Sequence, residues 1–196
     1  MRATDILKEE HQVILRVLHC LAAAAKDAER TKKLDTDSIR KSLEFFRGFA
    51  DACHHGKEEA QLFPVLGINN VSCTPATRHI LLAEHEEGRG YVRAMAENLE
   101  KYEMGDTTAL PRITTLATRY IEHLTQHIHK EDECLFPMAD SRLSAAEQED
   151  LLKAFEKVER EEMGAGTHER YLAIANDLCK RWNVEPVASA HSCCGH

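Results

Sequence analysis

Residues 54–64 read HHGKEEAQLFP, and residues 127–137 read HIHKEDECLFP. The two stretches share the pattern HxxKExxxLFP when His54 is aligned with His127. At almost the same offset, the pair Glu10-His11 aligns with the pair Glu84-His85. Self-similarity of this kind indicates a repeated structural unit. The sequence therefore predicts two similar helical hairpins related by an approximate two-fold axis.

The histidines and glutamates of the repeat have the spacing of a metal site. Residues four apart lie on one face of an α-helix, so each HxxxE pair could bind one metal or two adjacent metals. His11 and His85 come early in the first and third helices, and the two HxxxE pairs come late in the second and fourth. In an antiparallel bundle these four positions lie at the same end of the molecule. A single HxxxE pair is more often a solvated helix surface, but two in register favour a shared metal site. The candidate metal ligands are His11, His54, Glu58, His85, His127 and Glu131.

Composition and periodicity predict an all-α protein, since only 5 prolines and 9 glycines interrupt a chain rich in helix formers. Four long helices are expected at about 4–28, 36–64, 74–102 and 111–137, arranged as an antiparallel up-down-up-down four-helix bundle. Two additional C-terminal helices are expected, one at about 144–162 behind a Ser144-Glu147 capping box and one at 167–182. We predict a bundle domain over 1–140, a helical extension packed on it over 141–182, and a flexible Cys/His tail over 183–196.

Charge and hydropathy restrict the partners. The formal net charge of −8 and the lack of a Lys/Arg run argue against nucleic acid. No apolar stretch approaches the roughly 20 residues of a membrane span, and the first ten residues contain no signal-peptide core. Seven cysteines without a CxxC motif indicate reduced thiols. We expect a cytoplasmic monomer or homodimer that does not bind membranes and whose partners are small molecules.

On these motifs the sequence resembles the bacterial hemerythrin-like family of HHE cation-binding domains. The resemblance rests on the early EH motif of His11, on HHGKEExxLFP, on EHEEGR around His85 and on HIHKEDECLFP, and it extends over the predicted bundle domain, 1–140. It implies a cofactor of two non-haem Fe ions, bridged by the two glutamates and by an oxo or hydroxo group. Carried over by position, the iron ligands would be the six candidates named above.

The ligand set departs from that of the oxygen-carrying hemerythrins. Those proteins add a fifth histidine and usually end in an aspartate at a longer HxxxxD spacing, whereas this chain has four histidines and two glutamates. Both irons could then keep an exchangeable position, which suits reaction better than reversible transport. His123 lies one turn before His127 and is either a fifth ligand or a residue that contacts a ligand, and we favour the second role.

The predicted function is to bind or react with O2, H2O2 or NO, with redox chemistry of peroxide or oxygen preferred. This would be an activity like that of a peroxidase, a catalase or another oxidoreductase that acts on O2 or NO. The alternatives are sensing or binding of oxygen, nitric oxide or iron, and storage or donation of iron for the repair of iron centres. The sequence assigns no catalytic residue.

Other residues near the motifs are predicted to lie outside the site. His55 and His129 flank the ligand face and are expected at the surface. Tyr91 and Tyr120 could face the interior, but aromatic side chains at helical spacing more often serve packing. The tail HSCCGH, residues 191–196, could bind or transfer a metal, and this is the less favoured of its two interpretations.

Overall fold

The computed structural model describes residues 1–67, 78–164 and 166–185, and within these ranges all regular structure is helical. The prediction of an all-α protein is therefore confirmed. The elements are α1 (Ala3–Thr31), α2 (Thr36–Phe45), the π-helices η1 (Phe46–His55) and η2 (Glu58–Leu62), α3 (Phe63–Val65), α4 (Arg78–Glu103), α5 (Ala109–Lys130), the π-helix η4 (Glu131–Leu135), α6 (Phe136–Arg142), α7 (Ala145–Lys157), the π-helix η5 (Val158–Met163) and α8 (Thr167–Trp182).

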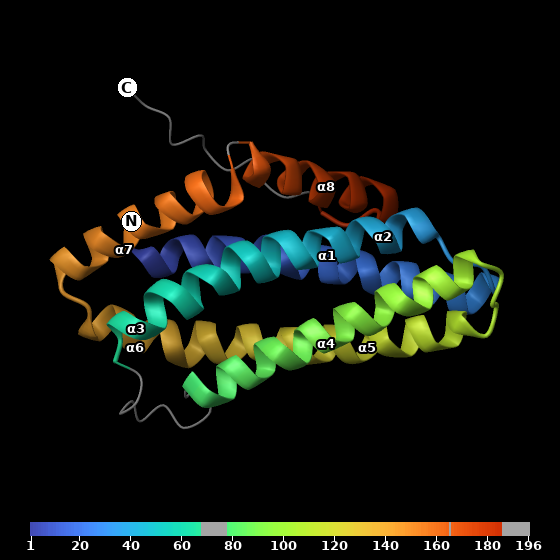
Figure 1. Cartoon of the computed structure of the whole chain (residues 1–196), viewed down its shortest axis with the longest axis horizontal. Helices are drawn as coiled ribbons and strands as arrows, with labels where there is room; N and C mark the ends of the chain where they lie inside the picture. The colour runs from blue at the N-terminus through green and yellow to red at the C-terminus, as the bar shows by residue number, and fades with distance from the viewer. Residues whose placement is uncertain (68–77, 165, 186–196) are drawn as a thin grey trace.

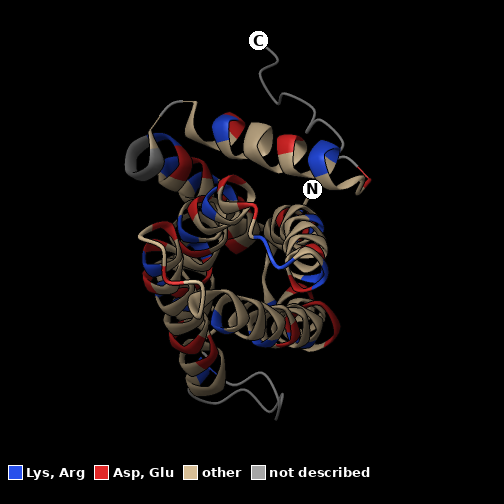
Figure 2. Cartoon of the chain, turned by 90° about the vertical axis from the view of Figure 1, so that its right-hand side faces the viewer, with Lys and Arg blue, Asp and Glu red and all other residues tan. Residues whose placement is uncertain are grey.

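The long helices lie side by side along the longest axis of the molecule (Figure 1). Helix α1 contacts both α5 and the α2–η1 segment, and α4 contacts the same two neighbours. These four segments therefore surround a common interior, which is seen from one end in Figure 2. Helices α7 and α8 lie along α1, and α8 also covers α2, so the C-terminal segment lies on one side of the other helices.

Local sequence signals fix several helix ends. Asp35 caps α2 by accepting a hydrogen bond from the amide of Ser38 at 3.1 Å, and the predicted capping box of Ser144 and Glu147 is present at the start of α7. Gly105 has a φ of +100°, a left-handed conformation that favours glycine, and it separates α4 from α5. The predicted start of the third helix near residue 74 lies outside the described residues.

The sequence predicts that the second and fourth helices end at Pro64 and Pro137, but the helical path continues past both prolines. In an α-helix a proline ring clashes with the carbonyl four residues earlier. In both copies of the motif a π-helical turn precedes the proline. The amide of Phe63 donates to the carbonyl of Glu58, and that of Phe136 donates to the carbonyl of Glu131. This wider turn is compatible with the proline ring, so the path extends through it to α3 and α6.

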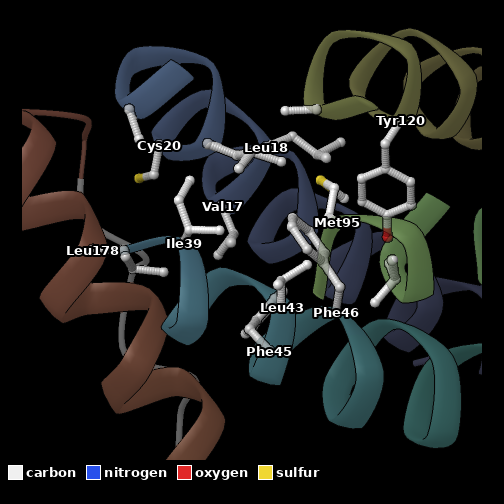
Figure 3. Packing of buried hydrophobic residues seen from close by; sticks show 14 of the residues in the cluster. Val17, Leu18, Cys20, Ile39, Leu43, Phe45, Phe46, Met95, Tyr120 and Leu178 are labelled. Carbon is white, nitrogen blue, oxygen red and sulfur yellow. The ribbon is translucent and has the colours of Figure 1, made fainter. Parts of the chain in front are cut away.

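Two clusters of buried apolar side chains lie along the helices. The larger one, part of which is shown in Figure 3, brings Phe46 of η1 against Tyr120 of α5 with ring centroids 4.9 Å apart. The smaller one contains Leu7 of α1 and the Leu-Phe pairs of both repeats. Along α1, His11 lies between Leu7 of the smaller cluster and Ile14 of the larger one. Apolar side chains therefore shield the region of His11 from water on both sides.

Two predictions about the whole chain meet different outcomes. Cys20 and Cys53 are buried free thiols, but Cys134 is disulfide-bonded, so the prediction of reduced thiols throughout is wrong.

None of the described helices is long and apolar enough to cross a membrane. The domain boundaries and the cytoplasmic location stay predictions, and most of the predicted tail, residues 186–196, lies outside the described residues.

Candidate metal centre

The structure brings the six predicted metal ligands together in the interior, where each is at most 1% exposed. Together with His55, which was not among the predicted ligands, they form two groups, within each of which the potential ligand atoms lie no more than 4.8 Å apart. The first group comprises His11, His54, Glu58 and Glu131, and the second comprises His55, Glu58, His85 and His127. Since Glu58 belongs to both, the groups are neighbouring positions of one centre.

Each glutamate divides its two oxygens between the histidine pairs. Oε2 of Glu131 lies 3.2 Å from Nε2 of His11, and its Oε1 lies 3.1 Å from Nε2 of His127. Oε1 of Glu58 lies 3.7 Å from Nε2 of His54, and its other oxygen lies 3.5 Å from Nε2 of His85. Two carboxylates arranged in this way could bridge a pair of cations.

Four further carboxylates orient the histidine rings from outside. Each accepts a hydrogen bond from Nδ1 of one ring, at 2.7 to 2.9 Å. The pairs are His11 with Asp132, His54 with Glu10, His85 with Glu59, and His127 with Glu84. A ring whose Nδ1 donates to a carboxylate presents Nε2 as a lone pair, which is the usual arrangement of a metal-binding histidine.

The inner atoms of the centre lack partners in the part of the chain that the structure describes. Nε2 of His11, Nε2 of His54 and all four carboxylate oxygens of Glu58 and Glu131 are buried without a hydrogen bond. Nε2 of His85 and Nε2 of His127 lie 3.0 Å apart, although the outer carboxylates make both of them lone-pair atoms. Unpaired buried polar atoms cost free energy, and metal cations would satisfy all of these atoms at once. The residues present therefore fit a metal centre.

The pKa shifts of the central residues also favour a bound cation. Burial raises the pKa of Glu58, and the neighbouring Glu131 carboxylate raises it further. Burial also raises the pKa of Glu131, but His127 and His11 outweigh this effect and hold it well below the usual range. Burial lowers the pKa of His127, whereas the nearby Glu131 and Glu84 carboxylates raise it to about 9. Two buried carboxylates that share one space are stabilised in ionised form by positive charge between them.

The same centre lies within a recognised domain. Residues 2–139 match the model of the hemerythrin HHE cation-binding domain, which is well over half of the chain. The chain belongs to the hemerythrin HHE family. Similar relatives include uncharacterized proteins of Mycobacterium tuberculosis and Mycobacterium bovis. Each is 23% identical over 182 residues, which cover 93% of this chain and 71% of the relative. No solved structure gives a significant match.

In this member of the HHE family the repeat extends beyond the inner residues. Nζ of Lys57 lies 2.5 Å from Oε1 of Glu10, and Lys130 forms the matching ion pair with Glu84. Sequence reasoning missed these lysines and the four outer carboxylates. The signal was present, because Lys57 aligns with Lys130 when the two repeats are superimposed, and Glu59 aligns with Asp132.

His55 is buried, with 5% of its surface exposed, so the prediction that it lies at the surface is wrong. Its ring stacks on that of His85, with centroids 3.8 Å apart and planes inclined by 10°. The prediction assumed the angular step of roughly 100° between consecutive residues of an α-helix. His55 instead ends the π-helix η1, in which a turn holds more residues and successive side chains diverge less.

The other neighbouring residues lie outside the inner groups. Nε2 of His123 donates to the backbone carbonyl of Glu84 at 2.8 Å, while the carboxylate of the same glutamate binds His127. In the structure His123 is thus linked to a candidate ligand through Glu84. His129 is exposed, as predicted. Tyr120 is buried against Phe46, and Tyr91 donates a hydrogen bond to Glu87 at 2.9 Å.

A third polar group brings Glu10, Cys53, Glu159 and His168 together between the first repeat and the C-terminal segment. Lys57 already lies at its centre, with Nζ 2.5 Å from both Glu10 and Glu159. The lysine ammonium supplies the positive charge there, so this group does not need a metal.

Proposed function

We propose that the protein is a non-haem di-iron protein that binds or reacts with O2, H2O2 or NO, chiefly through redox chemistry of peroxide or oxygen. The observation that carries this proposal is the division of the Glu58 and Glu131 oxygens between two sets of histidine nitrogens. The predicted up-down-up-down bundle is our proposed description of the topology, with α1, α2–α3, α4 and α5–α6 as its four members.

The donor set suits a first-row transition metal such as iron. One iron would be held by His11 and His54 and the other by His85 and His127, with Glu58 and Glu131 shared between them. Nitrogen and oxygen donors without a thiolate suit iron among the first-row transition metals. When bound, a pair of iron ions can change valence together and so supply the electrons for reduction or disproportionation of peroxide.

The chain's own residues prepare this site. The outer carboxylates fix the ring orientation and tautomer of the histidines, so that Nε2 is available before any metal arrives. Lys57 and Lys130 form ion pairs with Glu10 and Glu84. These ion pairs lower the free-energy cost of burying the two carboxylates that orient His54 and His127. The two apolar clusters limit the access of water and strengthen the electrostatic interactions inside the centre.

The test is metal analysis combined with reactivity. Purified protein is assayed for metal per chain, then reduced under anaerobic conditions, and its optical spectrum is followed as O2 and afterwards H2O2 are added. We expect two irons per chain and sustained consumption of peroxide. Two irons with a stable spectrum and no turnover would favour binding or sensing instead, and transfer of iron to an apo-protein would favour storage. Zinc, or no metal, would refute the di-iron proposal.

A further inference from the structure

A cavity of about 130 Å³ leads toward one side of the metal centre, between η1, α4 and α5. Its lining extends from the exposed Arg47 and Arg93 to the buried rings of His55, His85 and His127, and it does not include His11 or His54. An apolar cavity of about 150 Å³ can admit benzene. The space is therefore ample for a molecule of two or three heavy atoms, but it is too small for most metabolites.

Apolar groups form much of the wall of this cavity. Phe46 of η1 and Tyr120 of α5 approach each other across the interior, as Figure 3 shows, and Val92 and Leu124 lie nearby in the lining. Gly88 of α4 leaves space there, since a Cβ at this position would reach the Tyr120 ring at 3.7 Å, an ordinary contact distance. A side chain at position 88 would thus occupy the cavity without a backbone clash.

His55 is the polar group at the inner end whose role is unexplained. Neither of its ring nitrogens has a hydrogen-bond partner among the described residues, although the residue is buried. A metal bound to an imidazole lies close to the plane of the ring. The rings of His55 and His85 are stacked and nearly parallel, so their planes do not meet at one ion. In this orientation His55 does not share a metal with His85, and its nitrogens remain available to another group.

Arg89 holds the two stacked rings in place from the cavity wall. It donates to Asp51 and to Glu59, both at 2.8 Å. Glu59 accepts the hydrogen bond from Nδ1 of His85, and Oδ1 of Asp51 lies 3.5 Å from Nδ1 of His55. One arginine therefore holds the carboxylates that lie behind both rings.

We propose that this cavity binds the small molecule beside the His85–His127 metal position, and that His55 forms a hydrogen bond to it. The ligand class is a molecule of two or three heavy atoms with a lone pair or an O–H group, such as O2, H2O2, NO or azide. The inference rests on the proposed di-iron function for the metal and adds the side of access and the residue that contacts the ligand. It makes the two metal positions unequal, because the cavity reaches only the second one.

The cavity is tested first with a probe that does not bind metals. Xenon is added to the protein as purified, and the NMR shifts of the Val92 and Leu124 methyl groups are recorded for wild type, Gly88→Leu and Gly90→Leu. Gly90 lies on the same helix, but a Cβ there would meet nothing within 4 Å, which makes it the matched control. We expect xenon shifts in wild type and Gly90→Leu and their loss in Gly88→Leu. Equal shifts in both leucine variants, or none in wild type, would overturn the cavity assignment.

The role of His55 is tested on the iron-loaded protein with azide as the probe. We expect His55→Phe and His55→Leu to keep two irons per chain and an unchanged Mössbauer spectrum, but to bind azide roughly tenfold more weakly, the effect of one lost hydrogen bond. His129→Phe, a change of an exposed histidine on α5, should bind azide like wild type. Loss of iron or an altered Mössbauer spectrum in both His55 variants would identify a metal ligand instead. Unchanged azide affinity would exclude the contact.

The two experiments separate the two proposals. If the wild-type protein binds no iron, the di-iron function fails, while the xenon comparison still reports on the cavity. If iron binds and azide affinity is the same in all variants, the di-iron function stands and the cavity proposal fails.

Discussion

The two repeats have the same inner residues but different surroundings. In each, a Glu-His pair faces an HxxKE segment, and each ligand histidine is held by a carboxylate from the neighbouring helix. Around this shared pattern, His55 of the first repeat aligns with Ile128 of the second. The C-terminal helices cover α1 and α2, whereas the cavity opens between η1, α4 and α5.

This difference indicates that separate residues serve the proposed metal binding and the proposed entry of a small molecule. The candidate ligands of the proposed centre are duplicated, since each repeat supplies one histidine from a Glu-His pair and one HxxxE pair. The cavity that we propose for a small molecule lies on one side only, beside His85 and His127. A symmetric centre inside an asymmetric shell can therefore have two metal positions with different reactivity.

The largest effect should come from the two shared glutamates, and it should be the same for both. Glu58→Ala and Glu131→Ala each remove a carboxylate that faces both histidine pairs, so we expect each variant to lose the two-iron centre. Iron per chain after desalting is the measurement, with far-UV circular dichroism to verify the helical fold. His129→Ala should retain its iron. Full iron occupancy in both glutamate variants would show that the ligand assignment is wrong.

The buried lysine should be the next most sensitive position, and it distinguishes the repeats. Lys57 is fully buried between Glu10 and Glu159, whereas the side chain of Lys130 is 29% exposed. Lys57→Met leaves the buried Glu10 carboxylate without its cation, and we expect it to lower the free energy of unfolding by about 3 kcal/mol at pH 7. Lys130→Met should cost about 1 kcal/mol or less. Urea unfolding of both variants gives the comparison, and equal costs would contradict it.

The pH dependence of the same pair has a defined sign. Burial raises the pKa of Glu10, but Lys57 and His54 outweigh it and lower the value to about 2, below the 4.5 of the unfolded chain. The ionised carboxylate therefore stabilises the fold above about pH 4.5, and this contribution is lost as the pH falls toward 2. In Lys57→Met the folded pKa of Glu10 should move back toward 4.5, so the loss of stability in acid should be smaller and should end at higher pH. A parallel acid-unfolding curve for the variant would argue against the ion pair.

Smaller effects are expected at the outer carboxylates. Asp132→Ala frees Nδ1 of His11 and should weaken metal affinity by about 10 to 100-fold. Glu59→Ala should lie at the upper end of this range, because Glu59 binds both His85 and Arg89. Competition with a chelator of known affinity provides the measurement. A larger loss for Asp132→Ala than for Glu59→Ala would contradict the role of Arg89.

Much of this arrangement follows from the sequence because it depends on periodicity. The repeat with HxxxE spacing predicted which six residues meet, and the capping box of Ser144 and Glu147 predicted the start of α7. The position of His55 could not be predicted in this way, since a π-helical segment changes which neighbours share a face. The continuation of the helices through Pro64 and Pro137 was missed for the same reason.

Two glycines, one in each repeat, face a tyrosine and allow a further comparison of the two halves. A Cβ at Gly48 of η1 would lie 1.8 Å from Oη of Tyr171, so the Tyr171 side chain of α8 would have to move. A Cβ at Gly88 would meet the Tyr120 ring at 3.7 Å, which is an ordinary contact distance. We expect Gly48→Ala to lower the free energy of unfolding by about 1 to 3 kcal/mol and Gly88→Ala to leave it unchanged or raise it by up to about 1 kcal/mol. Thermal unfolding of both variants tests this. If Gly48→Ala were as stable as Gly88→Ala, α8 would not be held closely against the first repeat, and the asymmetric cover that distinguishes the two halves would be lost.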